Sequence, residues 1–228
     1  WTRGIISQKF PSGNVSIKLH PIGIFFCIFR KIPGIIKAVN YRRWGKSDFM
    51  SLEKHLEFQE KILKALNFCP KSLESCTRWD NKENPEDGFL ILYERKGFYS
   101  LAVAQYTVHH NFSISFQDEE PLLRFGNFYT GITHFKIDGV KADSSTPDSF
   151  LVLEGHLKGQ QFWKKGEQYC GIEVSIAPSF VELLKTVDPH IFSVTCFTRN
   201  VTYHWLPTAA MTTLRQLTNM AVRGTLTP

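Results

Sequence analysis

The side chains that could hold a metal ion or move a proton are few, and their spacing suits neither task. Adjacent His109 and His110 would point to opposite faces of a strand, while His134 and His156 each stand alone. A metal site needs several His, Cys or carboxylate side chains that converge on one point. We therefore expect no metal and no cofactor in this chain.

Motifs for nucleophilic catalysis and phosphate binding are also missing from the sequence. It contains no G-x-S-x-G turn, no G-x-x-x-x-G-K-[ST] loop and no G-x-G-x-x-G. Asp118, Glu119 and Glu120 form a run of carboxylates directly before Pro121, which is typical of a solvated turn. Because no catalytic constellation emerges, we interpret the chain as a protein that is not an enzyme.

The net charge of +6 comes from the first part of the chain. Residues 1–49 carry nine Lys or Arg and one acid, whereas the remaining residues carry 18 basic and 20 acidic side chains. A slightly acidic body lacks the charge pattern that binds nucleic-acid phosphates. Since periodic sequence starts only at Met50, we interpret residues 1–49 as a basic leader that precedes the natural start. A genuine basic tail or membrane-surface patch is the alternative.

The cysteines and the hydropathy indicate a cytoplasmic protein. The cysteines are odd in number and scattered, which favours free thiols in a reducing compartment; they are Cys27, Cys69, Cys76, Cys170 and Cys196. The longest apolar run, from Ile22 to Phe29, is too short to span a bilayer. We expect no contact with a membrane.

Hydrophobic periodicity divides the rest of the chain into three parts. Residues 50–84 are predicted to form an amphipathic helix, over 51–66, and a linker. Residues 85–177 contain short strand-like runs separated by turn sequences, at 89–95, 98–106, 112–116, 122–129, 132–138, 150–157, 160–164 and 169–176. This spacing predicts a mainly β fold with an antiparallel barrel or jelly roll. Residues 178–228 are predicted to form two or three helices, the last one from Leu206.

Three segments, in this order, carry a resemblance to a known family. Leu122–Gly131 has an aromatic pair and a terminal Gly, and Leu206–Leu217 has the pattern L-P-x-x-x-x-x-x-L-x-Q-L. Gln160–Ile176 is an aromatic strand, a predicted hairpin turn at Lys165-Gly166, and G-I-E-V-S-I with Gly171 as a bulge or close approach. Together they resemble the sensor domains of AraC-type bacterial transcription regulators.

This resemblance covers about residues 85–220 and implies a cupin-like barrel, a small-molecule effector and a homodimer. Members of the family continue into two helix-turn-helix motifs, which this sequence does not contain. We therefore expect DNA to be bound only through a domain outside this chain. The alternative function is a cupin-like small-molecule enzyme or binding protein on the same barrel.

Side-chain alternation along the strands nominates residues for a ligand pocket. Charges on apolar strands must be solvated, paired or used for a ligand, and aromatic side chains would line a barrel mouth or pack in the core. The candidates are Arg124, Phe125, Tyr129, His134, Trp163 and Glu173. Leu214 and Leu217, on the apolar stripe of the last helix, are candidates for the dimer interface, with packing inside one chain as the alternative.

Overall fold

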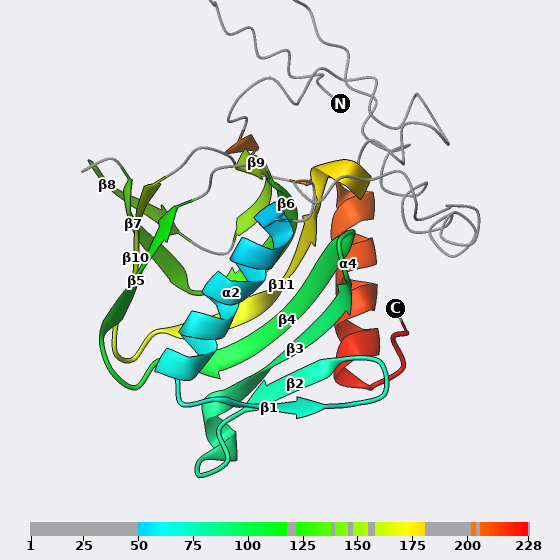
Figure 1. The fold of residues 1–228 in the computed structure, drawn as a ribbon, viewed down its shortest axis with the longest axis horizontal. Helices are drawn as coiled ribbons and strands as arrows, with labels where there is room; N and C mark the ends of the chain where they lie inside the picture. Colours follow the sequence, from blue (N-terminus) through cyan, green and yellow to red (C-terminus); the bar gives the residue numbers. More distant parts are fainter. Residues whose placement is uncertain are drawn as a thin grey trace, which may run out of the picture.

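A computed structural model describes residues 50–117, 122–137, 140–145, 148–154, 158–180, 202–203 and 206–227. Residues 1–49, interpreted above as a leader, lie outside the described part. The strands form two antiparallel sheets (Figure 1). None of the described helices is long and apolar enough to cross a membrane.

The large sheet has the strand order β1-β2-β3-β4-β11-β6-β9-β12. These strands are β1 (Cys69–Ser72), β2 (Thr77–Asp80), β3 (Gly88–Arg95), β4 (Tyr99–Thr107), β6 (Leu122–Thr130), β9 (Asp148–Glu154), β11 (Gln168–Ile176) and β12 (Thr202–Tyr203). The small sheet has the order β5-β10-β7-β8. Its strands are β5 (Phe112–Gln117), β7 (Ile132–Ile137), β8 (Val140–Ser145) and β10 (Lys158–Trp163).

Two helices flank the large sheet on opposite faces. The helix α2 (Met50–Ala65) lies between the two sheets, and α4 (Thr208–Val222) packs on the far side of the large sheet (Figure 1). A single turn of 3₁₀ helix, η3 (Pro85–Asp87), precedes β3. The large sheet is therefore covered on both faces, with α2 in the space that the sheets enclose.

The central strand β11 shows how the sequence supplies both faces. Because side chains alternate along a strand, Ile172 and Val174 point toward α4, where they belong to the core that contains Leu214. Tyr169 and Glu173 point the other way, toward α2 and its neighbours. From Gly171 onward every residue of β11 is buried, as expected for a strand covered on both sides.

The predicted fold class is confirmed, with differences at the edges. The described chain is mainly antiparallel β-sheet with a C-terminal helix, and its arrangement resembles a jelly roll, although the two sheets do not close into one barrel. The predicted strands between 88 and 176 are all present. The linker before residue 85 contributes β1 and β2 to the large sheet, and β8 was not predicted. Of the first predicted C-terminal helix only 178–180 is described, and it is helical.

The predicted hairpin over 160–176 is wrong, although its turn is present. Gly166 has the positive φ of 89° that the Lys165-Gly166 turn needs. The strands on either side pair with different partners, however: β10 pairs with β5 and β7, while β11 pairs with β4 and β6. The turn therefore carries the chain from the small sheet to the large one. Turn chemistry identifies the reversal but not the strand partners.

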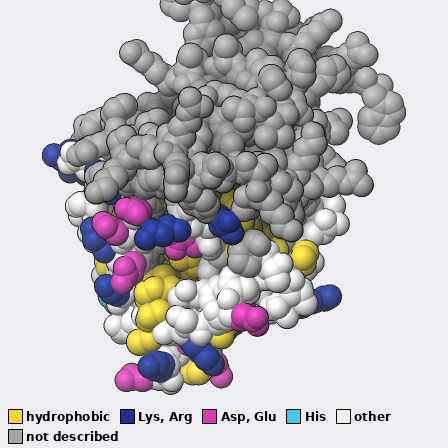
Figure 2. Space-filling model, turned by 45° about the vertical axis from the view of Figure 1, so that its right-hand side comes forward, with side chains coloured by type: hydrophobic (Ala, Val, Ile, Leu, Met, Phe, Trp, Pro, Cys, Tyr) yellow, Lys and Arg dark blue, Asp and Glu magenta, His cyan; other side chains and the backbone are white. Residues whose placement is uncertain are grey.

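The described surface carries both signs of charge. Figure 2 shows Lys or Arg and Asp or Glu side chains lying side by side, with hydrophobic side chains between them, on the described part of the face turned to the viewer. This mixed pattern agrees with the slightly acidic composition of the chain after residue 49. On this part of the surface, charge does not form the continuous basic patch that binds nucleic acid.

Gly171 is a position where the predicted close approach can be tested. The pairing of β11 with β6 shifts register between Cys170 and Gly171, and a Cβ at Gly171 would lie 2.5 Å from a ring carbon of Phe128 and 2.7 Å from the carbonyl oxygen of Asn127. Because backbone atoms cannot give way easily, we expect Gly171→Ala to lower the free energy of unfolding by about 3 kcal/mol in urea titrations.

The matched control is Gly166→Ala, where a Cβ would have no atom within 4 Å. This change should cost about 1 kcal/mol, from the positive φ alone. Equal losses for the two variants would contradict the close approach at Gly171.

Candidate functional site

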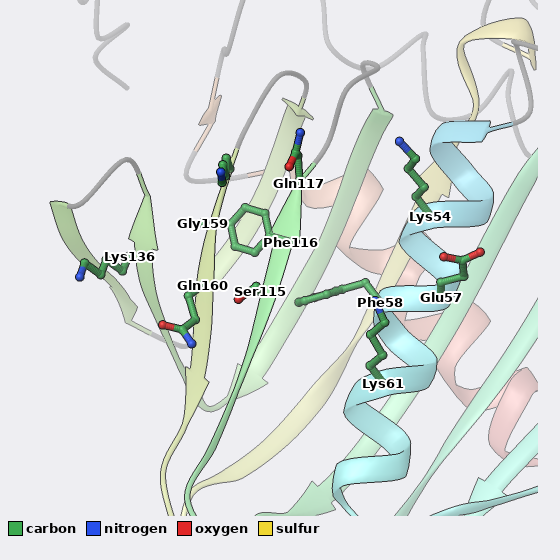
Figure 3. Close-up of a pocket in the computed structure, with 11 residues that line it drawn as sticks. Lys54, Glu57, Phe58, Lys61, Ser115, Phe116, Gln117, Lys136, Gly159 and Gln160 are labelled. Carbon is green, nitrogen blue, oxygen red and sulfur yellow. The ribbon is translucent and has the colours of Figure 1, made fainter.

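The helix α2 presents two different faces to the two sheets. Leu52, Leu63 and His55 are almost fully buried, and they lie on the face that turns toward the large sheet. Phe58, one helical turn from Lys54 and nearly one from Lys61, points toward β5 of the small sheet (Figure 3). The helix thus forms the boundary between a closed polar centre and an open groove.

The polar centre is built around the carboxylate of Glu173 on β11. Arg124 Nη2, from β6, donates to its Oε2 at 2.5 Å. His55 Nε2, from α2, bonds to its Oε1 at 2.9 Å, and Ser175 Oγ donates to the same oxygen at 3.2 Å. Gln59 Nε2 approaches Oε1 at 3.4 Å. These five residues form the Glu173 network.

The protonation states in the Glu173 network follow from its geometry. Burial alone would raise the pKa of Glu173, but the adjacent Arg124 guanidinium and the hydrogen bond from His55 outweigh it and hold the pKa well below its usual range. Glu173 is therefore an anion at neutral pH. Because a carboxylate can only accept hydrogen bonds, His55 Nε2 must carry the hydrogen. Such a weakly basic carboxylate is poorly suited to general-base catalysis.

Aromatic rings fill the enclosed space beside the Glu173 network. Trp163, which is 2% exposed, stacks on Phe112 with ring centroids 4.8 Å apart. The ring centroid of Phe58 lies 6.3 Å from that of Trp163 and 5.9 Å from that of Phe116, which it meets edge to face. Edge-to-face and offset-stacked pairs are the favoured geometries for such rings. This aromatic wall fixes the position of β5 against α2.

A second polar cluster joins the small sheet to the turn before β11. His134 Nε2, on β7, lies 2.8 Å from Glu167 Oε1, and the Tyr169 hydroxyl donates to Glu167 Oε2 at 3.0 Å. Although burial acts to raise the pKa of Glu167, the hydrogen bonds from His134, the Lys164 amide and Tyr169 lower it. Burial, assisted by Tyr106 and Glu167, raises the pKa of Tyr169. These groups hold one another in place.

The predicted pocket residues fall into different parts of the structure. Arg124 and Glu173 bond to each other in the Glu173 network, and Trp163 lines the same interior. His134 belongs to the separate cluster with Glu167. Phe125 is buried on the opposite face of β6, in the core beneath α4. Tyr129, half-buried near the end of β6, lies where the register with β11 shifts, because Gly171 pairs with Phe128 and Cys170 with Thr130.

The residues predicted for a dimer interface lie on the inner side of α4. Leu214 is fully buried in the core of the large sheet, so its side chain is covered within one chain. Leu217 is half-buried and packs against the same core. The more exposed apolar side chains of α4 are Met220 and Val222, at its C-terminal end.

The described histidines do not gather at one point. His109 Nε2 lies 2.8 Å from Asp87, and His110 is exposed beside the ring of Phe112. Within the described ranges no three His, Cys, Asp or Glu side chains come together in a way that could hold a metal ion. His156 lies outside these ranges.

Sequence reasoning missed the contribution of α2 to the site. His55 and Gln59, four residues apart on one helical face, both reach Glu173, yet the helix was predicted only as an amphipathic element, without a role in the site. The available signal was the position of His55, one turn from Leu52 on the apolar face. Its partner, 118 residues away, gave no local signal.

An open groove runs between α2 and the edge of the small sheet. It has a volume of about 590 Å³. Phe58 crosses the gap from α2 toward Phe116 on β5, and Lys54 and Lys61 lie on either side of Phe58 along the helix (Figure 3). The other lining residues are Glu57, Ser115, Gln117, Lys136, Lys158, Gly159 and Gln160. We call this space the α2–β5 groove.

The coupling between Arg124 and Glu173 can be measured with a double-mutant cycle. Breaking a largely buried ion pair leaves a charge without its partner, so we expect Arg124→Met to cost about 3 kcal/mol of unfolding free energy. The same change in a Glu173→Gln background should cost less than half of this, since no buried anion remains. Urea unfolding of the four proteins gives the coupling energy.

A second cycle on Arg78 and Asp80 serves as the matched control. These side chains bond at 2.9 Å but are 37% and 31% exposed, so their coupling should stay below about 1 kcal/mol. Equal coupling in the two cycles would show that the Glu173 pair behaves as a surface pair.

The stability difference between the wild type and Glu173→Gln should depend on pH. Because folding lowers the pKa of Glu173 from 4.5, the contribution of its anion is complete above pH 4.5 and is lost as the pH falls toward the folded-state pKa. The unfolding free energies of the wild type and Glu173→Gln should therefore approach each other as the pH is lowered from 6 to about 3. A difference that stays constant over this range would contradict the lowered pKa.

Comparisons with known proteins find similar structures but no similar sequences. No protein-family model matches the chain, and no curated protein matches it. The cupin domain of Cnp3 from Schizosaccharomyces pombe is 6% identical, with 41% of this chain and 68% of that one covered and a TM-score of 0.32. KdgF from Halomonas sp. is 12% identical, with 48% and 86% covered and a TM-score of 0.30.

A third structure, a Cupin 2 conserved barrel domain protein from Salinispora arenicola, is 15% identical, with 39% and 71% covered and a TM-score of 0.30. All three are similar to this chain over less than half of its length. The likeness is limited to the arrangement of strands.

Proposed function

We propose that this chain is the effector-sensing part of an AraC-type transcription regulator, and that it binds a small molecule without changing it chemically. The observation that carries the proposal is the position of α2. One face of this helix is bonded to the large sheet through the Glu173 network, and its other face lines an open groove. A ligand in the groove would contact the helix and the small sheet at once.

This arrangement supports sensing because a bound molecule would contact both α2 and β5. A ligand shifts an equilibrium only if it binds one arrangement of the protein better than another. Since Phe58 from α2 and Phe116 from β5 both line the groove, ligand affinity depends on how these elements are placed. An effector would thus favour one placement of α2 over others.

The state of the ionisable groups supports binding without catalysis. Glu173 accepts bonds from Arg124 and Ser175 as well as from His55, and its low pKa makes it a weak base. His134 and Glu167 are likewise bonded to each other. A catalytic acid or base needs a pKa near the working pH and access to a substrate proton. These groups instead hold structural elements together.

The regulator assignment rests on the three segments that resemble the AraC-type family. In the structure they lie on β6, on β10 and β11, and on the first part of α4. The assignment implies a cytoplasmic homodimer that contacts DNA only through a further domain. In this proposal α4 supports the dimer through the half-buried Leu217, while Leu214 packs inside the core of one chain.

A ligand screen followed by a reporter assay tests the proposed function. We expect the purified chain to be stabilised by at least one compound in a thermal-shift screen, and that compound should be recovered unchanged, as seen by NMR, after long incubation. Fused to a DNA-binding domain that represses only as a dimer, the chain should change reporter expression when the compound is added. The wild-type fusion without compound is the control.

Two results would overturn this proposal in favour of a cupin-like enzyme. One is conversion of the stabilising compound into a product. The other is stoichiometric iron, zinc or manganese in the purified protein together with loss of compound binding after metal removal.

A further inference from the structure

We propose that the α2–β5 groove binds an organic anion with a flat apolar body, such as an aromatic acid or phosphate ester. This inference deepens the sensor function and rests on it. Its basis is a combination of lysines and phenylalanines supplied by segments that are far apart in the sequence: α2, β5, β7 and β10. The strand β5 and the helix α2 face each other across the groove (Figure 3).

The charge of the groove favours an anion. Four lysines and one glutamate line it, namely Lys54, Lys61, Lys136, Lys158 and Glu57. This gives the lining a formal charge of +3 within a chain whose part after residue 49 is slightly acidic. Lysine is a compact charge on a flexible stem, so Lys54 and Lys61 on α2 can turn toward one anionic group, whereas the Lys136 side chain points away from α2 (Figure 3). A partly enclosed cleft with an excess of positive charge also raises the local concentration of anions.

The aromatic part of the lining favours a flat apolar body. Phe58 and Phe116 meet edge to face at 5.9 Å, and each is only half-buried. Trp163 stacks on Phe112 with ring centroids 4.8 Å apart and also packs against Phe58. A ring laid against Phe58 and Phe116 would remove their remaining apolar surface from water, which is favourable.

The size and polar lining of the groove fit a small organic molecule. Its volume of about 590 Å³ lies within the usual range of roughly 300–1,000 Å³ for ligand pockets. Ser115, Gln117 and Gln160 also line it, and the Gln160 amide donates to Ser113 Oγ at 2.9 Å. A polymer would need a longer track, and a bare inorganic ion would leave the phenylalanines exposed.

An NMR titration of the complete chain with 1-naphthyl phosphate tests the proposal. We expect shifts centred on the amides of Phe58 and Phe116 and a Kd on the order of 1 mM or tighter. Neutral 1-naphthol and inorganic phosphate, which each lack one half of the ligand, should bind at least about fivefold more weakly. Binding should weaken with added salt.

Two pairs of lysine variants with the same change in net charge distinguish binding in the groove from general electrostatic attraction to the protein. Lys61→Ser with Lys158→Ser removes two exposed lysines from the groove, while Lys71→Ser with Lys165→Ser removes two exposed lysines elsewhere. The first pair should weaken binding about fivefold and the second pair less than twofold. Phe58→Leu, which keeps the packing against Trp163 apolar, should weaken 1-naphthyl phosphate but leave inorganic phosphate unchanged.

The proposal is overturned if the two lysine pairs weaken binding equally, or if the shifted amides lie away from α2 and β5. It is also overturned if 1-naphthol binds as well as 1-naphthyl phosphate. If the thermal-shift screen yields an effector that is insensitive to the groove lysines, the ligand class is wrong and the sensor function stands. If groove binding holds but the reporter does not respond, the sensor function fails and the binding site stands.

Discussion

The buried carboxylate of Glu173 joins the helix α2 to the large sheet, and the arrangement of the interior depends on it. Its two oxygens serve different elements: Oε2 accepts from Arg124 on β6, and Oε1 bonds to His55 on α2. A buried charge is tolerated only where partners replace the lost water. Moving α2 away would break the hydrogen bond from His55 and leave the Glu173 carboxylate with too few partners. The network therefore favours one placement of the helix over the others that hydrophobic contact alone would allow.

That placement decides what the other side of α2 can do. Because His55 and Gln59 are directed at β11, the residues about 100° around the helix, Lys54, Phe58 and Lys61, are directed at β5. The same rotation of the helix thus completes the polar centre and forms the groove. A rotation of α2 that alters the contacts of one face also alters those of the other, since the helix rotates as a rigid unit. The groove and the Glu173 network are therefore coupled through the position of α2.

Alternation and turn chemistry were sufficient to predict the β-rich fold and nearly all strands between residues 88 and 176. They also singled out Arg124 and Glu173 as charges that must be solvated, paired or used for a ligand, and in the structure the two bond to each other. His55 could not be predicted as a third member because it lies 118 residues from Glu173. The groove was beyond local sequence analysis for the same reason: its lysines and phenylalanines come from four separate elements. Likewise, the turn at Gly166 was predictable, but the sheets to which β10 and β11 belong depend on pairing over long distances.

The strand β11 lies between the two helices and is buried on both faces. Glu173 on one face meets α2, and its neighbours Ile172 and Val174 on the other face belong to the core that includes Leu214 of α4. Close-packed interiors transmit displacement instead of absorbing it, since they contain few voids. A shift of α2 that pulls on Glu173 must therefore be accommodated in the same backbone that supports α4. For the proposed sensor, this gives a physical route from a ligand beside α2 to the helix α4.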